Sequence, residues 1–532
     1  MKEEEIRELE EAYQTDYELG QDNLRILGMD LHNPVFFVSS FLILVFVVGT
    51  LMVPKKANGM LNATKNWIIE HFDWVFMVGG NIFVLFCLAL IALPVGRIRL
   101  GGQDARPEFT TLSWFSMLFA AGMGIGLMFW SVAEPVGYFT DWFGTPFNVG
   151  AGGEESARLA MGAAMFHWGL HPWAVFGLVA LALAFFAFNK DMPLTIRSAF
   201  YPLLGDRVWG WPGDVIDIFA VLATLFGLAT SLGLGVMQAG GGLHYLLDIP
   251  NSINLQVGII VGVTVVALIS VVRGVHGGVR LLSNLNMTLA GLLLLFVILA
   301  GSTMAILGWM GQTAVSYVQN IIPLSNWIGR EDQGFLHDWT VFYWAWWISW
   351  SPFVGMFIAR VSRGRTIREF MTAVLLIPTL ITVVWMGAFG GSAIEQVMAG
   401  TGSLASGISS VDTAMFEMLD NLPLASLTAG LAIFLVLVFF VTSSDSGSLV
   451  IDSITSGGKV DAPVAQRIFW ATIEGLIAGT LLFGGGEKAL EALQSGAIST
   501  GLPFTIVLLL MCVSLYKGLQ HEHLLLRFKH GE

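Results

Sequence analysis

The sequence is poor in charged residues and in cysteine. Charged side chains make up 12% of its 532 residues and hydrophobic side chains 55%, and the mean hydropathy is +0.72. The two cysteines, Cys87 and Cys512, both lie inside apolar runs, which excludes a disulfide framework and a multi-cysteine metal site. The net charge is −13, with nine acidic residues among the first 22, so nucleic acid is an unlikely partner.

Catalytic signatures are also missing from the sequence. It contains no His-Glu-x-x-His motif, no Walker loop and no Gly-x-Ser-x-Gly elbow. We therefore do not expect an enzyme. Because there is no ATP site, any solute movement is expected to be driven by an ion gradient or by exchange.

Long apolar runs dominate what is present. Many of them reach 18 residues, enough to cross the roughly 30 Å core of a bilayer, which predicts an all-α polytopic membrane protein. We predict twelve spans, at 34–53, 73–96, 111–139, 158–188, 213–240, 254–272, 284–310, 339–360, 369–393, 424–450, 467–485 and 497–516. Residues 61–72 and 313–327 are expected to form separate interfacial helices.

Charge asymmetry predicts the orientation of these spans. With a cytoplasmic N-terminus, the outer segments hold only six of the 26 lysine and arginine residues: Lys55, Lys56, Lys65, Arg158, Arg330 and Lys488. Both termini are therefore expected inside. The acidic segment 1–33 precedes the first span without a basic n-region, so that span is expected to remain as an anchor. Residues 517–532 are expected to form a short cytoplasmic tail.

Two of the spans carry helix-breaking residues. The third contains AAGMGIG at residues 120–126, and the eighth contains Pro352 and Gly355. Glycine permits non-helical backbone, and proline removes a helical hydrogen bond. Two interrupted helices indicate an inverted-repeat transporter with its substrate site at the breaks. The alternative for AAGMGIG is close helix packing through small residues.

Two aromatic stretches suggest the ligand. They are FYWAWWISWSPFVGMF (Phe342 to Phe357) and FHWGLHPWAVF (Phe166 to Phe176). Several π faces with no nearby carboxylate suit a quaternary ammonium. Tryptophans in membrane proteins also form interfacial belts, but Trp168 lies well inside an apolar run. We therefore favour a ligand cage for Trp168 and Trp347 and leave Trp344 to a belt or to packing.

Hydroxyl pairs and ionisable groups inside the spans are the remaining candidates. Thr230-Ser231 and Thr442-Ser443 either bond to their own helix or offer oxygen ligands to Na⁺. Buried charges in membranes are functional candidates, but Glu134 could as easily lie at an interface. His167 and His171 are four residues apart and lack a third metal ligand at suitable spacing.

These motifs together resemble the betaine/choline/carnitine transporter family. The similarity covers about residues 30–515 and is strongest in FYWAWWISWSPFVGMFIARVSRGRTIREF, AAGMGIG and HWGLHPW. It implies a LeuT-like fold in which two inverted five-helix repeats, at about 111–310 and 339–516, follow two extra helices. It also implies a homotrimer in the inner membrane.

The resemblance assigns site residues. The aromatic box for the onium head is Trp168, Trp173, Phe176 and Trp347, with Phe176 where the family often has tyrosine. The neighbouring pathway is lined by Trp346, Trp350 and Phe357. The unwound segment that contacts substrate is Gly122, Met123, Gly124, Ile125 and Gly126. The sodium site is formed by Ala120, Met123, Phe439, Thr442 and Ser443. A second sodium site would use Thr224 and Phe353, although one of its threonines is replaced by Leu228.

The implied function is Na⁺-coupled import of a small quaternary ammonium or sulfonium zwitterion, with no cofactor besides the coupling ion. Sodium-independent relatives carry a basic group where this sequence has Arg280, so proton-coupled choline transport and substrate/product exchange stay open. Arg280 also fits an inner-loop arginine that follows the charge bias. A betaine receptor that does not transport is a third alternative.

Overall fold

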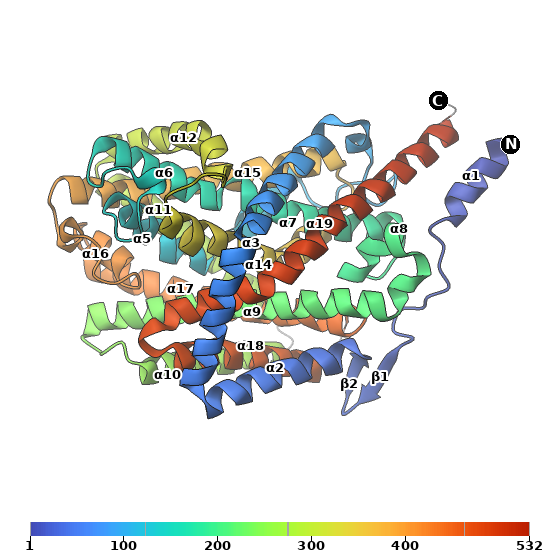
Figure 1. Ribbon diagram of the computed structural model, residues 1–532, viewed down its shortest axis with the longest axis horizontal. Coiled ribbons are helices and arrows are strands. Elements are labelled where there is room, and N and C mark those ends of the chain that lie inside the picture. The colour runs from blue at the N-terminus through green and yellow to red at the C-terminus, as the bar shows by residue number, and fades with distance from the viewer. Residues whose placement is uncertain (1, 123, 274–275, 462, 531–532) are drawn as a thin grey trace.

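The computed structural model describes residues 2–122, 124–273, 276–461 and 463–530, and almost all of this chain is helical (Figure 1). Helix α1 (Lys2–Glu11) comes first. It is followed by the antiparallel strands β1 (Asn23–Ile26) and β2 (Met29–His32). The strands pair from Asn23 with His32 to Ile26 with Met29.

The other helices follow this hairpin. Those of the first half are α2 (Val35–Met52), α3 (Pro54–Ala92), α4 (Thr111–Gly122), α5 (Ile125–Phe139), α6 (Glu154–Trp168), α7 (Leu170–Asn189), α8 (Tyr201–Leu204), α9 (Trp211–Leu247), α10 (Ile253–Arg273), α11 (His276–Ala300) and α12 (Thr303–Ser325). Those of the second half are α13 (Gln333–Phe335), α14 (Val341–Arg360), α15 (Ile367–Met398), α16 (Ala414–Asp420), α17 (Ala425–Thr455), α18 (Val464–Gly485) and α19 (Ala489–His530). A π-helical turn, Leu336–Thr340, leads into α14.

Many of these helices are apolar enough to span a membrane. Within the described residues, nine segments meet the length and composition of a span. The predicted spans 467–485 and 497–516 fall together in one of them, Val464–Lys529. The predicted spans 111–139 and 339–360 lie outside the nine, the first because it is divided into two short helices. The count of twelve and the inverted repeats therefore stay predictions.

Several predicted helix boundaries were wrong. Residues 61–72 are not a separate helix, because α3 runs without a break from Pro54 to Ala92. The predicted span 284–310 ends at Ala300, and the separate helix predicted at 313–327 is present as α12 but begins earlier, at Thr303. Between them, Gly301 closes α11 by donating its N–H to the carbonyl of Val297.

The predicted span 158–188 is also divided, at Gly169. The Gly169 backbone leaves the helical region at φ −95°, ψ −130°. A Cβ at this position would lie 2.6 Å from the Tyr317 hydroxyl oxygen. That hydroxyl accepts a hydrogen bond at 2.8 Å from the Leu170 N–H, the first residue of α7. Glycine is thus required here because α12 approaches the break closely.

The expected break at Pro352 does not occur. Helix α14 continues through Pro352 to Arg360 and packs against α7, α9 and α19 in the middle of the molecule (Figure 1). Gly355 serves this packing, since a Cβ there would lie 2.7 Å from a methyl carbon of Val179 on α7. In the eighth span, close helix packing therefore explains the glycine better than an interrupted helix does.

Candidate functional site

The expected break in the third span is present. Helix α4 ends at Gly122 and α5 begins at Ile125, while Met123 lies outside the described residues. Gly124 is extended, with φ −170° and ψ −171°. The first N–H groups of α5 therefore have no preceding helical turn to bond to.

A cavity of about 150 Å³ lies beside this break. It is lined by nearly all of the described residues predicted for substrate and sodium: Ala120, Gly124, Ile125, Gly126, Trp168, Trp173, Phe176, Trp346, Trp347, Trp350, Phe353, Phe357, Phe439, Thr442 and Ser443. These residues come from α4, α5, α6, α7, α14 and α17. The structure thus brings the predicted aromatic and hydroxyl groups to one place.

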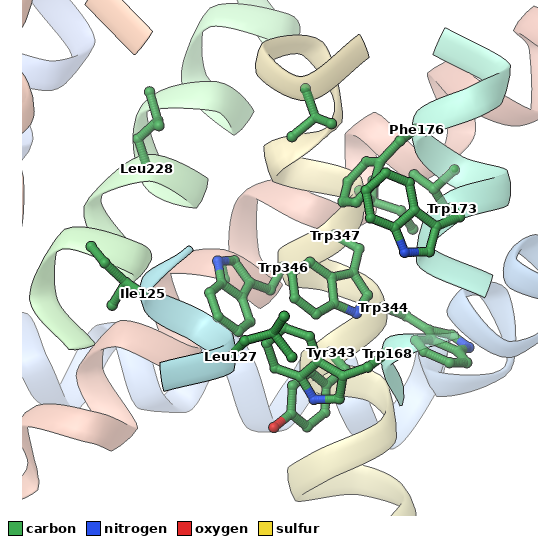
Figure 2. Packing of buried hydrophobic residues seen from close by; sticks show 14 of the residues in the cluster. Ile125, Leu127, Trp168, Trp173, Phe176, Leu228, Tyr343, Trp344, Trp346 and Trp347 are labelled. Carbon is green, nitrogen blue, oxygen red and sulfur yellow. The ribbon is translucent and has the colours of Figure 1, made fainter. Parts of the chain in front are cut away.

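Aromatic rings line the cavity, and Figure 2 shows Trp168, Trp173, Phe176, Trp346 and Trp347 gathered close together. Trp346 and Trp347 stack on α14 with centroids 4.5 Å apart and planes 16° apart. Trp168 meets Trp347 edge-on, at 4.8 Å and 74°, and Phe176 meets it at 6.0 Å and 84°. Trp173 lies 5.4 Å from Phe176 at 84°. Rings set at steep angles to one another can offer several π faces to one ligand.

Hydrogen bonds fix three of these tryptophans. The Trp346 Nε1–H is shared between the Gly227 carbonyl at 3.3 Å and the Ser231 hydroxyl at 3.2 Å. The Trp168 Nε1–H donates to Glu134 Oε2 at 2.8 Å. The Trp347 Nε1–H donates to the backbone carbonyl of His167, also at 2.8 Å. The indoles of Trp168 and Trp347 are buried, with 6% and 3% of their surface exposed. Their orientations are therefore set by the protein before any ligand binds.

Glycine at position 126 allows the rings to come this close to α5. A Cβ at Gly126 would lie 2.6 Å from Trp168 Cη2 and 2.9 Å from Trp346 Cη2. Such distances are well inside van der Waals contact, so a larger residue would displace the rings. Gly126 is thus a packing position of the cage as well as part of the broken helix.

The hydroxyl pair of α17 lies on the same cavity. The Thr442 hydroxyl donates to the carbonyls of Val438 at 3.0 Å and Phe439 at 3.2 Å. A hydroxyl oxygen that donates its hydrogen still has lone pairs for a cation. Ala120, at the end of α4, completes the described part of the predicted sodium set.

Of the two residues predicted for the second sodium site, only one lies at the cavity. Phe353 lines the cavity, whereas Thr224 is not among the lining residues. Thr224 is fully buried in α9, and its hydroxyl donates to the Ala220 carbonyl at 2.6 Å. The side chain of Arg280 lies outside the described part of the structure.

Several polar lining residues were missed from the sequence. They are Ser283, Asn286, Thr382 and Ser446, whereas Ser231, which was predicted as a possible Na⁺ ligand, also lines the cavity. Together these five residues lie on α9, α11, α15 and α17, which are far apart in the chain. Polar residues inside apolar helices occur both at cavities and in packed cores, so this signal does not separate the two.

The largest error concerns Glu134, since the cage was expected to have no nearby carboxylate. Glu134 does not line the cavity, but it is fully buried directly behind Trp168. The sequence signal was a lone glutamate in an apolar run, before Pro135. The sequence left a functional role and an interface position equally open, because it does not show which helices surround α5.

The histidines next to the cage have structural partners. His167 Nδ1 lies 2.5 Å from Glu134 Oε1. His171 stacks on Trp344, with centroids 4.9 Å apart, so Trp344 is a buried packing residue rather than a belt residue. Within the described chain, no three His, Cys, Asp or Glu side chains are grouped to hold a metal ion.

Known proteins are similar to this chain over most of its length. The model of the betaine/carnitine/choline family transporter (BCCT) matches residues 34–524. The chain is 61% identical over 510 residues to glycine betaine transporter 1 of Vibrio parahaemolyticus serotype O3:K6 (strain RIMD 2210633), covering 96% of this chain and 97% of the relative. It is 59% identical over 510 residues to a glycine betaine/proline/choline/ectoine transporter of the same strain, covering 96% and 91%. It is 43% identical over 494 residues to the glycine betaine transporter OpuD of Bacillus subtilis (strain 168), covering 92% and 94%.

Proposed function

The chain belongs to the betaine/carnitine/choline family of transporters, and from this premise we propose that it imports a glycine betaine type zwitterion by Na⁺ symport. It is a multi-pass membrane transporter and not an enzyme. The observation that carries the proposal is one cavity lined both by the aromatic cage and by the hydroxyl pair Thr442-Ser443. Substrate and ion would therefore bind close together.

The cage supports a ligand with a methylated onium head. Such a head carries a positive charge without N–H donors, so π faces can hold it where hydrogen-bond acceptors cannot. The rings of Trp168, Trp173, Phe176 and Trp347 supply these faces. A sulfonium head has the same charge and a similar size, so it would fit the same cage. Two of the relatives described above are named glycine betaine transporters, and the third is also named for choline, proline and ectoine.

The broken third span supports binding of the carboxylate. The N–H groups of Ile125, Gly126 and Leu127 begin α5, and all three residues line the cavity. Free N–H groups at a helix start, together with the positive end of the helix dipole, favour an anion. The zwitterion would thus lie with its head in the cage and its carboxylate toward the start of α5.

The hydroxyl pair supports sodium as the coupling ion. Na⁺ prefers neutral oxygen ligands, including carbonyls freed at helix breaks. The hydroxyls of Thr442 and Ser443 and the carbonyl of Ala120 would supply such ligands, together with Phe439. An ion held here would link α4 to α17. Binding of the ion would therefore help to hold in place the break between α4 and α5, where the substrate carboxylate is proposed to bind.

The charge bias, together with what the resemblance to the family implies, supports a proposal for the surroundings of the transporter. We place it in the inner membrane as a homotrimer with both termini cytoplasmic. Its partners are the onium substrate and the lipid bilayer. The positive-inside distribution of lysine and arginine supports this orientation.

The test is uptake of radiolabelled glycine betaine into proteoliposomes, with an inward Na⁺ gradient compared with an equal K⁺ gradient. Accumulation with Na⁺ alone is expected. Equal uptake under the two gradients would contradict Na⁺ symport and indicate proton coupling or exchange. Saturable binding without accumulation would indicate a receptor. If betaine does not accumulate, choline and a sulfonium analogue are the next substrates to assay under the same gradients.

A further inference from the structure

Glu134 forms a saturated hydrogen-bond network behind the cage. Its side chain is fully buried on α5. It accepts hydrogen bonds from the Tyr138 hydroxyl at 3.1 Å, the Tyr343 hydroxyl at 2.7 Å and the Trp168 indole at 2.8 Å. His167 Nδ1 lies 2.5 Å from the same carboxylate. These partners come from α5, α6 and α14, so the network joins three helices around the cage.

The number of partners indicates the charge on Glu134. An ionised carboxylate accepts at about four lone-pair positions and has no hydrogen to donate, and this one has four partners. His167 Nε2 lies 2.9 Å from the Thr340 hydroxyl, which can donate to it while Nδ1–H donates to Glu134. In the part of the chain that the structure describes, no lysine or arginine forms an ion pair with Glu134. A carboxylate that accepts from four partners therefore lies behind Trp168.

The network reaches both tryptophans that face each other in the cage. Trp168 is bound through its indole N–H, and its benzene ring points to Gly126. Trp347 is bound to the carbonyl of His167, whose ring is bound to Glu134. The carboxylate therefore holds Trp168 directly, and Trp347 bonds to the backbone of the adjacent residue, His167.

We propose that Glu134 is a positioning residue that fixes the orientation of Trp168 and makes the cage prefer ligands with a fixed positive charge. The proposal rests on the function proposed above, because it assigns an onium head to the cage. A hydrogen bond to an ionised acceptor is about twice as strong as one between neutral groups. An anionic acceptor also polarises the indole and moves electron density onto its π face, which strengthens attraction for a cation.

The first test is Glu134→Gln, which keeps the size of the side chain and removes its charge. We expect the KM for glycine betaine to rise about tenfold while the maximal rate and the amount of reconstituted protein stay within about twofold. The matched control is Glu395→Gln, because Glu395 accepts a hydrogen bond from the Trp309 indole at 2.7 Å and lies away from the cage. The control is expected to leave KM unchanged. A fall in maximal rate or protein amount at unchanged KM would overturn the proposal.

A double-mutant cycle separates action through Trp168 from a general structural role. Trp168→Phe keeps a π face and removes the N–H that bonds Glu134. If Glu134 acts through this bond, Glu134→Gln should raise KM less than about twofold in the Trp168→Phe background, because coupled residues are not additive. The same tenfold rise in both backgrounds would overturn the proposal.

Binding of tetramethylammonium, followed by tryptophan fluorescence in detergent, makes the test independent of transport. Weaker binding to Glu134→Gln than to wild type is expected even if betaine is not the transported substrate, so the two proposals can fail separately.

If Glu134→Gln does not fold, Trp168→Phe is compared with Trp173→Phe. The former should lose more affinity, because the Trp168 indole bonds the carboxylate. Equal losses would contradict the proposal.

Discussion

At the scale of single residues, the site depends on which polar groups bond to the protein and which groups remain available to a ligand. The indole N–H groups of Trp168 and Trp347 bond to the protein, which leaves their π faces for a ligand. The hydroxyl of Thr442 bonds to carbonyls of its own helix and keeps lone pairs toward the cavity. A cation held by π faces and a cation held by oxygen can thus share one cavity of about 150 Å³.

Replacing Trp347 tests the cation–π contribution. Trp347→Leu keeps an apolar side chain but removes a π face, which is worth about 1–2 kcal/mol in a desolvated site. We expect the KM for glycine betaine to rise at least about tenfold in proteoliposome uptake, with the protein still folded. Trp347→Phe is the control, because it keeps a ring, and it should retain most of the affinity. Unchanged uptake by Trp347→Leu would remove Trp347 from the cage.

Replacing Thr442 tests the ion site. Thr442→Ala removes one proposed oxygen ligand, and we expect the Na⁺ concentration for half-maximal uptake to rise about tenfold, as for loss of roughly 1–2 kcal/mol. Thr472→Ala is the matched control, because Thr472 on α18 also donates to the carbonyl four residues before it and does not line the cavity. If both variants show the wild-type Na⁺ dependence, the ion binds elsewhere.

At the scale of helices, the break between α4 and α5 is the element that builds the site. It exposes the start of α5 to the cavity and places Gly126 beneath two tryptophan rings. The glycine run predicted this break because three glycines in one short segment are costly in a continuous helix. The close approach of Trp168 and Trp346 to Gly126 could not be predicted, since it depends on packing among α5, α6 and α14.

The Gly126→Ala variant tests that packing. Its Cβ would meet Trp168 Cη2 at 2.6 Å and Trp346 Cη2 at 2.9 Å, so the rings must move. Overpacking of this kind costs about 1–3 kcal/mol, and we expect a rise in the KM for glycine betaine of about tenfold or more. Gly308→Ala is the control, because a Cβ there meets no atom within 4 Å. Wild-type affinity in Gly126→Ala would show that the ring positions do not set the affinity.

Proline and glutamate show where sequence reasoning fails at this scale. Pro352 was expected to break its helix, but α14 continues because packing against α7, α9 and α19 stabilises it. For Glu134 the sequence could not decide between a functional role and an interface, whereas in the structure four partners from three helices satisfy it inside the protein. Both outcomes depend on neighbours that are distant in the chain. The aromatic stretch from Phe342 to Phe357 and the hydroxyl pair Thr442-Ser443 were predictable because the residues of each are close in sequence.

At the scale of the whole molecule, the N-terminal segment is attached to the helical body rather than separate from it. Asp30 in β2 accepts hydrogen bonds from Lys459 at 2.5 Å and from Asn23 at 2.8 Å. Asn23 also donates to the carbonyl of Ser456, next to the end of α17. Near the other terminus, Lys529 of α19 pairs with Glu10 of α1 at 2.7 Å, and these two helices lie side by side (Figure 1). Both ends of the chain therefore contact the transporter.

Removing the charge of Asp30 tests this attachment. Burial raises the pKa of the Asp30 carboxyl, but hydrogen bonds from Lys459 and Asn23 and the Lys459 charge lower it more, so the pKa lies below its ordinary value. A carboxyl with a lowered pKa stabilises the fold above its unfolded pKa and loses that contribution as the pH falls through the folded value. Asp30→Asn should therefore lower the thermal unfolding midpoint in detergent by about 2 °C at pH 7, and the difference from wild type should shrink below about pH 4. Arg25→Ala is the control, since Arg25 is 84% exposed and lies 3.9 Å from Asp30; it should match wild type at both pH values. Equal midpoints for Asp30→Asn and wild type at pH 7 would mean that the hairpin contributes nothing to the stability of the transporter.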